Sequence, residues 1–305
     1  MILGFLAYIF IFGLGLCIGS LLNCVIYRLP DESPANAGHS DGPVKMREAL
    51  LSGRQSLIKK LRGRSFCPNC KHTLSWTDLV PVFSFMFFKA KCRYCRKKIS
   101  WQYPAVELAT GAIFLLMLNF KFQILNEIQI LNFINLAFWF YVASSLIIIF
   151  VYDLKHYIIP DKVLFPAIGI TAVYRIFEFG ILDFENLNLF RISDFGFRIF
   201  GGYLLAAIIA SGFFLVIFLI SKGRWMGFGD VKLAVLMGLL LGVNNVLAAL
   251  FLAFFFGAII SIILIVLREK KLKSEIPFGP FLIIGTFMAM FWGQQIISWY
   301  FNMFI

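Results

Sequence analysis

The stretch Gly227–Leu233 has the sequence Gly-Phe-Gly-Asp-Val-Lys-Leu, and the rest of the chain is organised around it. It places the carboxylate of Asp230 on a glycine-bearing turn between two strongly apolar runs. An ionisable group at the middle of a membrane helix costs roughly 2.5–3.5 kcal/mol on insertion scales, so such a group marks a functional site by default. A second carboxylate, Asp153 in the stretch Val151–Lys155, also ends an apolar run. The two aspartates are therefore the first candidates for a shared site.

The composition indicates that the bilayer is the solvent for most of the chain. Of the 305 residues, 60% are hydrophobic and only 14% are charged, and the mean hydropathy is +0.86. A soluble domain carries about 25% charged residues. The net charge of +12 could suggest nucleic acid, but about half of the 28 basic residues fall in one polar segment between Arg28 and Lys98. We expect a polytopic membrane protein that contacts lipid and binds no nucleic acid.

Apolar runs of about 17 residues or more predict transmembrane helices. Residues 2–22 carry no charge, and they lack the basic region and cleavage site of a signal peptide, so the first run is read as a span. The predicted spans lie near 3–27, 104–121, 130–152, 162–179, 197–221, 246–267 and 279–303, with a shorter run from Asp230 to about Gly242. The predicted fold class is an all-α polytopic membrane protein with about eight transmembrane helices.

The distribution of lysine and arginine predicts the orientation of the chain. Basic residues gather in every second loop, and the loops between are poor in them. The basic loops are 28–103, the one with Lys155 and Lys162, the one with Lys222 and Arg224, and 268–273; the others lie near 122–129, 180–196 and 243–245. By the positive-inside rule the basic loops are cytoplasmic and the N-terminus is periplasmic. Asp153 and Asp230 then both lie at cytoplasmic ends of spans, where they could meet.

Three parts are expected: a first transmembrane helix over 1–27, a cytoplasmic domain over 28–103 and a transmembrane core over 104–305. Within the cytoplasmic domain, residues 31–44 are rich in Pro, Gly and Ser and predict a flexible linker. Residues 46–62 are either a short basic helix lying on the anionic leaflet or a solvated run of charge.

Two Cys-x-x-Cys pairs in the predicted cytoplasmic domain indicate a metal site. Cys67 and Cys70 form the first pair, and Cys92 and Cys95 form the second. Four thiolates at this spacing suit one tetrahedral zinc ion in a small zinc-ribbon-like insertion. The alternative is a pair of disulfides, which the reducing cytoplasm disfavours.

Asp153 and Asp230 together suggest an aspartic protease built inside the membrane. Paired carboxylates at hydrogen-bonding distance share a proton, so that one can activate water while the other protonates the carbonyl oxygen or the leaving amine. The pair titrates as a unit, so the two roles cannot be assigned to one aspartate or the other. Alternatively, each aspartate pairs with a nearby lysine, Lys155 or Lys232, and only anchors its helix at the interface.

These motifs, with others in the chain, resemble those of the type IV prepilin peptidases. The two aspartate motifs are similar to the two catalytic motifs of that family, and the double Cys-x-x-Cys is similar to its cytoplasmic domain. The resembling stretches stand in family order across almost the whole chain: Gly19–Pro30, Cys67–Cys95, Gln102–Leu108, Asp153–Asp161, Gly227–Leu233 and Ile276–Phe281.

The resemblance implies a bifunctional enzyme of the bacterial inner membrane. Such an enzyme cleaves the basic leader from type IV prepilins or type II secretion pseudopilins, then methylates the new N-terminal residue with S-adenosylmethionine. Asp153 and Asp230 match the catalytic aspartates of the family. Two departures are Lys155, where some members carry an acidic residue, and a 31–65 segment longer than expected.

The methyltransferase activity rests on the resemblance alone, because nothing in the chain resembles a glycine-rich nucleotide-binding fold. One alternative is a protease without methyltransferase activity. Another is a membrane transporter or scaffold that uses Asp153 and Asp230 for ion coupling.

A prepilin has a basic leader in the cytoplasm and an apolar helix in the bilayer, so its scissile bond lies at the face where both aspartates are predicted. The basic loops would not attract such a leader, which leaves helix docking and acidic positions such as Asp161 or Glu107 to give specificity. Asp161 could equally be a helix N-cap, and Glu107 could equally pair with Arg28.

Overall fold

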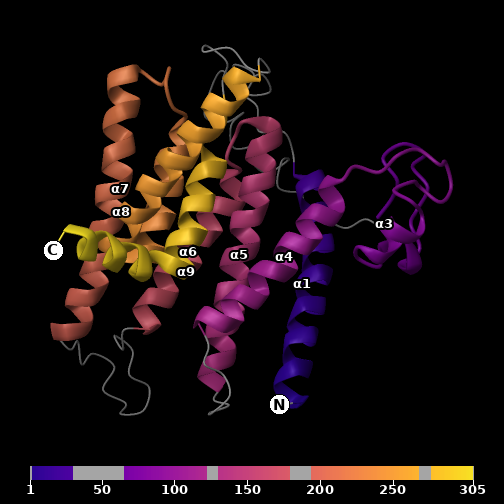
Figure 1. The fold of residues 1–305 in the computed structure, drawn as a ribbon, viewed down its shortest axis with the longest axis horizontal. Helices are drawn as coiled ribbons and strands as arrows, with labels where there is room; N and C mark the ends of the chain where they lie inside the picture. The colour runs from indigo at the N-terminus through magenta and orange to yellow at the C-terminus, as the bar shows by residue number, and fades with distance from the viewer. Residues whose placement is uncertain (1, 30–64, 122–129, 179–193, 268–275, 305) are drawn as a thin grey trace, which may run out of the picture. The chain divides into compact units, whose positions relative to one another are not determined.

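The computed structural model describes residues 2–29, 65–121, 130–178, 194–267 and 276–304, and its regular structure there is helical (Figure 1). Within these ranges the only β-pairing consists of two isolated bridges, Phe66–Thr73 and Lys91–Lys98. The all-α prediction is confirmed. The predicted linker over 31–44 and the predicted basic helix over 46–62 lie outside the described residues.

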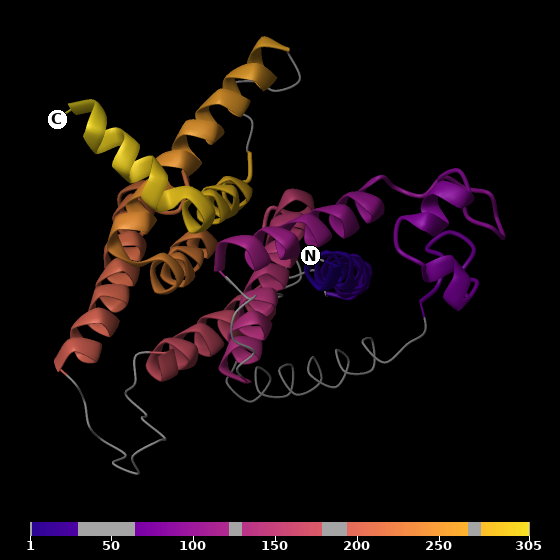
Figure 2. The same ribbon diagram turned by 60° about the horizontal axis from the view of Figure 1, so that its bottom comes forward.

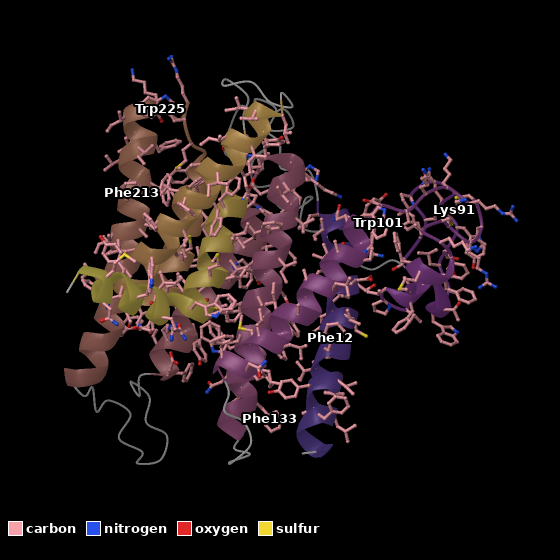
Figure 3. All side chains as sticks on the ribbon, viewed as in Figure 1. Phe12, Lys91, Trp101, Phe133, Phe213 and Trp225 are labelled. Atoms are coloured by element: carbon pink, nitrogen blue, oxygen red, sulfur yellow. The ribbon has the colours of Figure 1, made fainter. Side chains whose placement is uncertain are left out.

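Within the described ranges, six helices are long and apolar enough to cross a membrane. They are α1 (Ile2–Arg28), α4 (Gln102–Lys121), α5 (Ile130–His156), α7 (Asp194–Ser221), α8 (Phe228–Val266) and α9 (Gly279–Phe304). The remaining elements are the 3-10 helix η2 (Trp76–Leu79) and the helices α3 (Phe83–Phe87) and α6 (Asp161–Glu178). Large apolar side chains are exposed on the long helices, as at Phe133 and Phe213 (Figure 3), which is the surface expected of helices in lipid.

The helix α8 corresponds to two of the predicted spans. Its 39 residues would extend about 58 Å as one straight helix, roughly twice the 30 Å hydrocarbon core of a bilayer. The backbone leaves the helical conformation at Gly242, where φ is 72° and ψ is 175°. Positive φ is strained for a residue with a Cβ, so glycine permits a break there. Figure 2 shows the resulting change of direction in the orange ribbon, which divides α8 at the position where the sequence predicted a boundary.

The chain divides into two compact units, Met1–Ile148 and Ile149–Ile305. In the first unit α1 packs on α4, and in the second α8 packs on α6, α7 and α9 (Figure 1). The second unit contains both aspartates of the predicted site. The first contains all four cysteines of the insertion.

The helices α1 and α4 approach closely because small residues line their contact. Gly15 and Gly19 lie one turn apart on α1, and a Cβ on Gly15 would be 2.7 Å from the Cα of Gly111 on α4. A Cβ on Gly19 would be 2.6 Å from the Cα of Glu107. This is the spacing by which membrane helices bring their backbones into contact. It holds the first turns of α4 against the last turns of α1.

Candidate active site

Asp230 lies at the amino end of α8 because the Gly-Phe-Gly stretch starts the helix there. Gly227 is the N-cap, and the backbone N–H of Asp230 donates to the Gly227 carbonyl at 3.2 Å. The Asp230 carboxylate accepts the backbone N–H of Gly227 in return. A negative charge in the first turn also interacts favourably with the helix dipole. This placement allows a carboxylate that is only 8% exposed to sit at the start of an apolar helix.

Asp153 lies in the last turn of α5 and is 4% exposed. Its carboxylate accepts the backbone N–H of Gly279, the first residue of α9. A Cβ on Gly279 would lie against Oδ2 of Asp153, so the contact requires a residue without a side chain. Asp153 therefore lies at the positive end of the α9 dipole, and Asp230 lies at the positive end of the dipole of its own helix, α8.

The structure brings the two aspartates together within the unit Ile149–Ile305. Asp153 lies close enough to Asp230 for the two carboxylates to interact electrostatically, and both groups are buried. Two carboxylates that share a buried site are the arrangement in which one proton is held between them.

Ile159, in the segment between α5 and α6, packs beneath both helix starts. A Cβ on Gly229 would be 3.1 Å from the Ile159 Cβ, and a Cβ on Gly279 would be 3.5 Å from its Cδ1. Ile159 is itself buried. One apolar side chain thus sets the spacing between the start of α8, which carries Asp230, and the start of α9, which contacts Asp153.

Lys232 forms its ion pair with Asp161 rather than with Asp230. The Nζ atom of Lys232 lies 2.6 Å and 2.8 Å from the two carboxylate oxygens of Asp161. The aromatic rings of Phe165 and Phe228 lie 5.3 Å and 5.5 Å from the same Nζ. Since α6 starts at Asp161 and α8 starts two residues before Asp230, this pair ties the amino ends of the two helices together.

The two acidic residues considered for substrate specificity are engaged within the protein. Asp161 pairs with Lys232, and it is the first residue of α6, with the Pro160 carbonyl accepting the first backbone bonds of that helix. Glu107, on α4, accepts the backbone N–H of Val82 at 2.8 Å and the hydroxyl of Ser20. Both carboxylates hold elements of the protein in place.

The four cysteines of the insertion form one cluster. The sulfur atoms of Cys67, Cys70, Cys92 and Cys95 all lie within 4.8 Å of one another, and the Cys67 and Cys95 sulfurs are 3.9 Å apart. Burial would raise the pKa of the Cys67 thiol, but the backbone N–H groups of Cys70 and Asn69 and the thiols of Cys70 and Cys92 bring it to about 7. A lowered thiol pKa favours the thiolate, the form that binds metal. The cluster could hold one metal ion.

The two cysteine pairs belong to a short internal repeat. In each copy the residue after the second cysteine has positive φ, 57° at Lys71 and 56° at Arg96. The first cysteine of each copy donates its N–H across the turn, to His72 O at 3.0 Å or to Lys97 O at 2.9 Å. The matched positions are Cys67 with Cys92, Cys70 with Cys95, Lys71 with Arg96, Leu74 with Ile99, Ser75 with Ser100, and Trp76 with Trp101.

Asp78 links the two copies of the repeat. Its Oδ2 accepts from the Ser75 N–H at 3.0 Å, the Ser75 hydroxyl at 2.9 Å and the Tyr94 hydroxyl at 3.3 Å. The Arg93 guanidinium lies 3.9 Å from its other oxygen. Burial would raise the pKa of Asp78, but these donors and the Arg93 charge outweigh burial and lower it.

Known proteins match the chain over nearly its whole length. Residues 13–121 match the Bacterial Peptidase A24 N-terminal domain, and residues 140–262 match the Type IV leader peptidase family. A prepilin leader peptidase/N-methyltransferase of Pseudomonas aeruginosa is 30% identical over 94% of this chain and 91% of its own length. The chain belongs to the type IV leader peptidase family.

Two other prepilin leader peptidase/N-methyltransferases extend the comparison. The protein of Aeromonas hydrophila is 30% identical over 99% of this chain and 97% of its own length. That of Bacillus subtilis is 32% identical over 79% of this chain and 86% of its own. No solved structure matches the chain.

The two family matches cover different parts of the candidate sites. The leader peptidase match contains Asp153 and Asp230, and the A24 N-terminal match contains the cysteine cluster and Glu107. Gly279, which donates to Asp153, lies beyond both. The sequence showed Gly279 only as part of the Ile276–Phe281 stretch, and nothing in its pattern indicated the contact with Asp153.

Proposed function

We propose that Asp153 and Asp230 are the catalytic pair of this leader peptidase and cleave the leader from type IV prepilins or type II secretion pseudopilins. The observation that carries the proposal is the proximity of two buried carboxylates, Asp230 in the first turn of α8 and Asp153 against the first residue of α9. The relatives, named prepilin leader peptidase/N-methyltransferase, support the two reactions proposed, leader cleavage and N-methylation.

The chemistry follows from a pair that shares one proton. The ionised carboxylate takes a proton from a water molecule as its oxygen attacks the scissile carbonyl carbon, and the protonated partner gives its proton to the carbonyl oxygen. The tetrahedral intermediate then collapses: the C–N bond breaks, the leaving amine takes the proton held by the pair, and one hydroxyl of the intermediate returns its proton to the pair. The products are the leader carboxylate and a free amino terminus, and the pair again holds one proton.

The protein contributes orientation and fixed dipoles to this reaction. The Gly279 N–H holds the Asp153 carboxylate, and the Gly227 N–H holds that of Asp230, so neither group must reorganise when charge moves. Ile159 fixes the distance between the two helix starts that carry these donors.

Substrate docking is proposed to occur at the membrane face where α5 ends and α8 begins. The loop charges support the proposal that this is the cytoplasmic face of the inner membrane, with the N-terminus periplasmic. A prepilin places its scissile bond there because its leader is basic and its next segment is an apolar helix. Since Asp161 and Glu107 are engaged internally, docking of that apolar helix is the main source of specificity.

We assign the metal of the cysteine cluster as structural zinc. A tetrahedral Zn–S site with bonds of about 2.3 Å has sulfurs about 3.8 Å apart. The 3.9 Å separation of the Cys67 and Cys95 sulfurs is close to that value. Bound zinc would cross-link the two copies of the repeat, and it takes no part in cleavage.

The methyl transfer is proposed from the relatives' names alone, with S-adenosylmethionine as the donor. The described residues do not distinguish a set of side chains for this donor. No step of the cleavage passes through it.

The test is incubation of the purified full chain with a prepilin in detergent, with and without S-adenosylmethionine. Mass spectrometry of the product should show loss of the leader in both samples and one added methyl group only with the donor. Leader loss without methylation would reduce the activity to a protease. An intact prepilin in both samples would contradict the proposed function.

A further inference from the structure

The segment between the two copies of the cysteine repeat exposes a cluster of large apolar side chains. Phe83, Met86 and Phe87 are 68%, 69% and 79% exposed, and all lie on or at the start of the short helix α3. Phe85 points the other way and packs edge-on against the ring of Trp101, with centroids 4.9 Å apart. The helix α3 is therefore packed on one side through Phe85 and exposes large apolar side chains on the other.

A hydrogen-bond chain sets the depth of this segment relative to the membrane helices. Val82, the residue before α3, donates its N–H to Glu107, and Glu107 also accepts the hydroxyl of Ser20 on α1. Ser20 lies eight residues before Arg28, the last residue of α1, which corresponds to about 12 Å along the helix. All three residues belong to the unit Met1–Ile148. The start of α3 thus lies beside the apolar part of α1, inward from its charged end.

Irregular backbone at this depth requires its polar groups to be paired. Val82 has φ 58°, outside helix and strand, so its N–H has no partner within a regular element. The carboxylate of Glu107 provides that partner at 2.8 Å. This accounts for a buried acidic residue early in a membrane helix.

Exposed basic residues follow the apolar segment in the chain. Lys89, Lys91 and Arg93 follow α3 directly and are exposed (Figure 3 labels Lys91). Apolar side chains flanked by lysine and arginine are typical of elements that lie in the interface of an anionic leaflet, about 5–10 Å into the headgroup and acyl boundary.

We propose that α3 is a lipid anchor of the insertion: Phe83, Met86 and Phe87 enter the leaflet beside the end of α1, and Glu107 fixes their depth through Val82. The cysteine repeat is thereby tethered to the membrane surface through the segment between its two copies. The occupant of this face is membrane lipid, and the inference is independent of the proposed cleavage chemistry.

The test is photo-crosslinking of the full chain in nanodiscs of phosphatidylethanolamine and phosphatidylglycerol. The photoreactive residue p-benzoylphenylalanine replaces Phe87 in one sample, and intact mass reports any covalent lipid adduct. Phe213, exposed on the membrane helix α7, is the positive control position, and Lys97, exposed on the second repeat copy, is the negative one. Position 87 should give a lipid adduct close in yield to position 213 and several-fold above position 97.

A lipid adduct at position 87 no more abundant than at position 97 would overturn the proposal. A cross-linked pair of chains in its place would assign the face to a second copy and would also overturn it.

The role of Glu107 is tested in the same assay. Glu107→Gln keeps an oxygen that accepts from Val82, whereas Glu107→Leu does not. The Gln variant should retain the adduct at position 87 and the Leu variant should lose most of it, with metal content unchanged in both. Equal yields in the two variants would show that Glu107 does not set the depth of α3. If Glu107→Leu fails to fold, the yields at positions 87, 97 and 213 in the otherwise unchanged chain still decide the anchor.

Discussion

The two aspartates are held in place by backbone groups rather than by opposite charges. Asp153 and Asp230 each accept an N–H at a helix start, and the nearest lysine in sequence to Asp230 is paired elsewhere. Both aspartates could be found from the sequence because a carboxylate next to an apolar run stands out. Gly279 could not, because its contact with Asp153 depends on how α9 meets α5.

The first prediction concerns Gly279→Ala. The added methyl group would meet Oδ2 of Asp153 and displace the carboxylate from the site. A displacement of about 1 Å can cost on the order of 100-fold in rate, so we expect kcat/KM for leader removal to fall about 10- to 100-fold. Gly212→Ala on α7 is the control, since nothing lies within 4 Å of a Cβ there. Normal activity of Gly279→Ala would mean that Gly279 does not position Asp153.

The second prediction concerns the ion pair of Lys232 and Asp161. The pair is partly exposed, with side-chain exposures of 22% and 42%, so its contribution to stability is small, at most about 1 kcal/mol. We expect Lys232→Met, Asp161→Asn and the double variant to lower cleavage to a similar extent, because each releases the same link between α6 and α8. Additive losses in the double variant would show that the two residues act independently.

At the scale of elements, a buried arginine accounts for the stability of the break in α8. Arg175 on α6 is 4% exposed and donates to the carbonyls of Leu239 at 3.0 Å and Leu240 at 2.7 Å. Its guanidinium lies 4.2 Å from the ring centroid of Tyr203 and also pairs with Glu178. These carbonyls belong to the turn just before Gly242, where the helix cannot satisfy them. A charged residue within the predicted 162–179 span thus has a structural role.

The third prediction is that Arg175→Met lowers the stability of the protein although both aspartates are left unaltered. Each buried carbonyl left unpaired costs about 1–3 kcal/mol. Arg175→Lys should rescue only part of the loss, since lysine lacks the planar fork that reaches both oxygens. Thermal unfolding in detergent measures the effect, with exposed Arg224→Met as the control. A melting temperature equal to that of the unchanged chain would refute the capping role.

The fourth prediction concerns the cysteine cluster. Cys70→Ser or Cys95→Ser should remove bound zinc and loosen the insertion, because a structural zinc site loses its closed set of four ligands. Cys24→Ser, on α1, should leave the metal content unchanged. Metal analysis of the purified proteins gives the answer, and the absence of zinc from the unchanged chain would count against the site.

At the scale of the whole molecule, the apolar runs predicted the long helices well because a bilayer requires each to satisfy its own backbone. The two spans predicted within α8 lie one before and one after the break at Gly242. The sequence did not show which helices pack together, since α1 meets α4 and α8 meets α6, α7 and α9 through residues far apart in the chain. The proposed depth of α3 was also not predictable, because it depends on the hydrogen bonds that Glu107 accepts from Val82 and Ser20.

The most direct test of the central claim is cleavage of a prepilin by the purified Asp153→Asn and Asp230→Asn variants. Asparagine nearly preserves the shape of the side chain but cannot act as base or share the proton. Neither variant should remove the leader, although both should stay in the membrane and keep the stability of the unchanged chain. Full processing of the prepilin by either variant would show that Asp153 and Asp230 are not the catalytic pair.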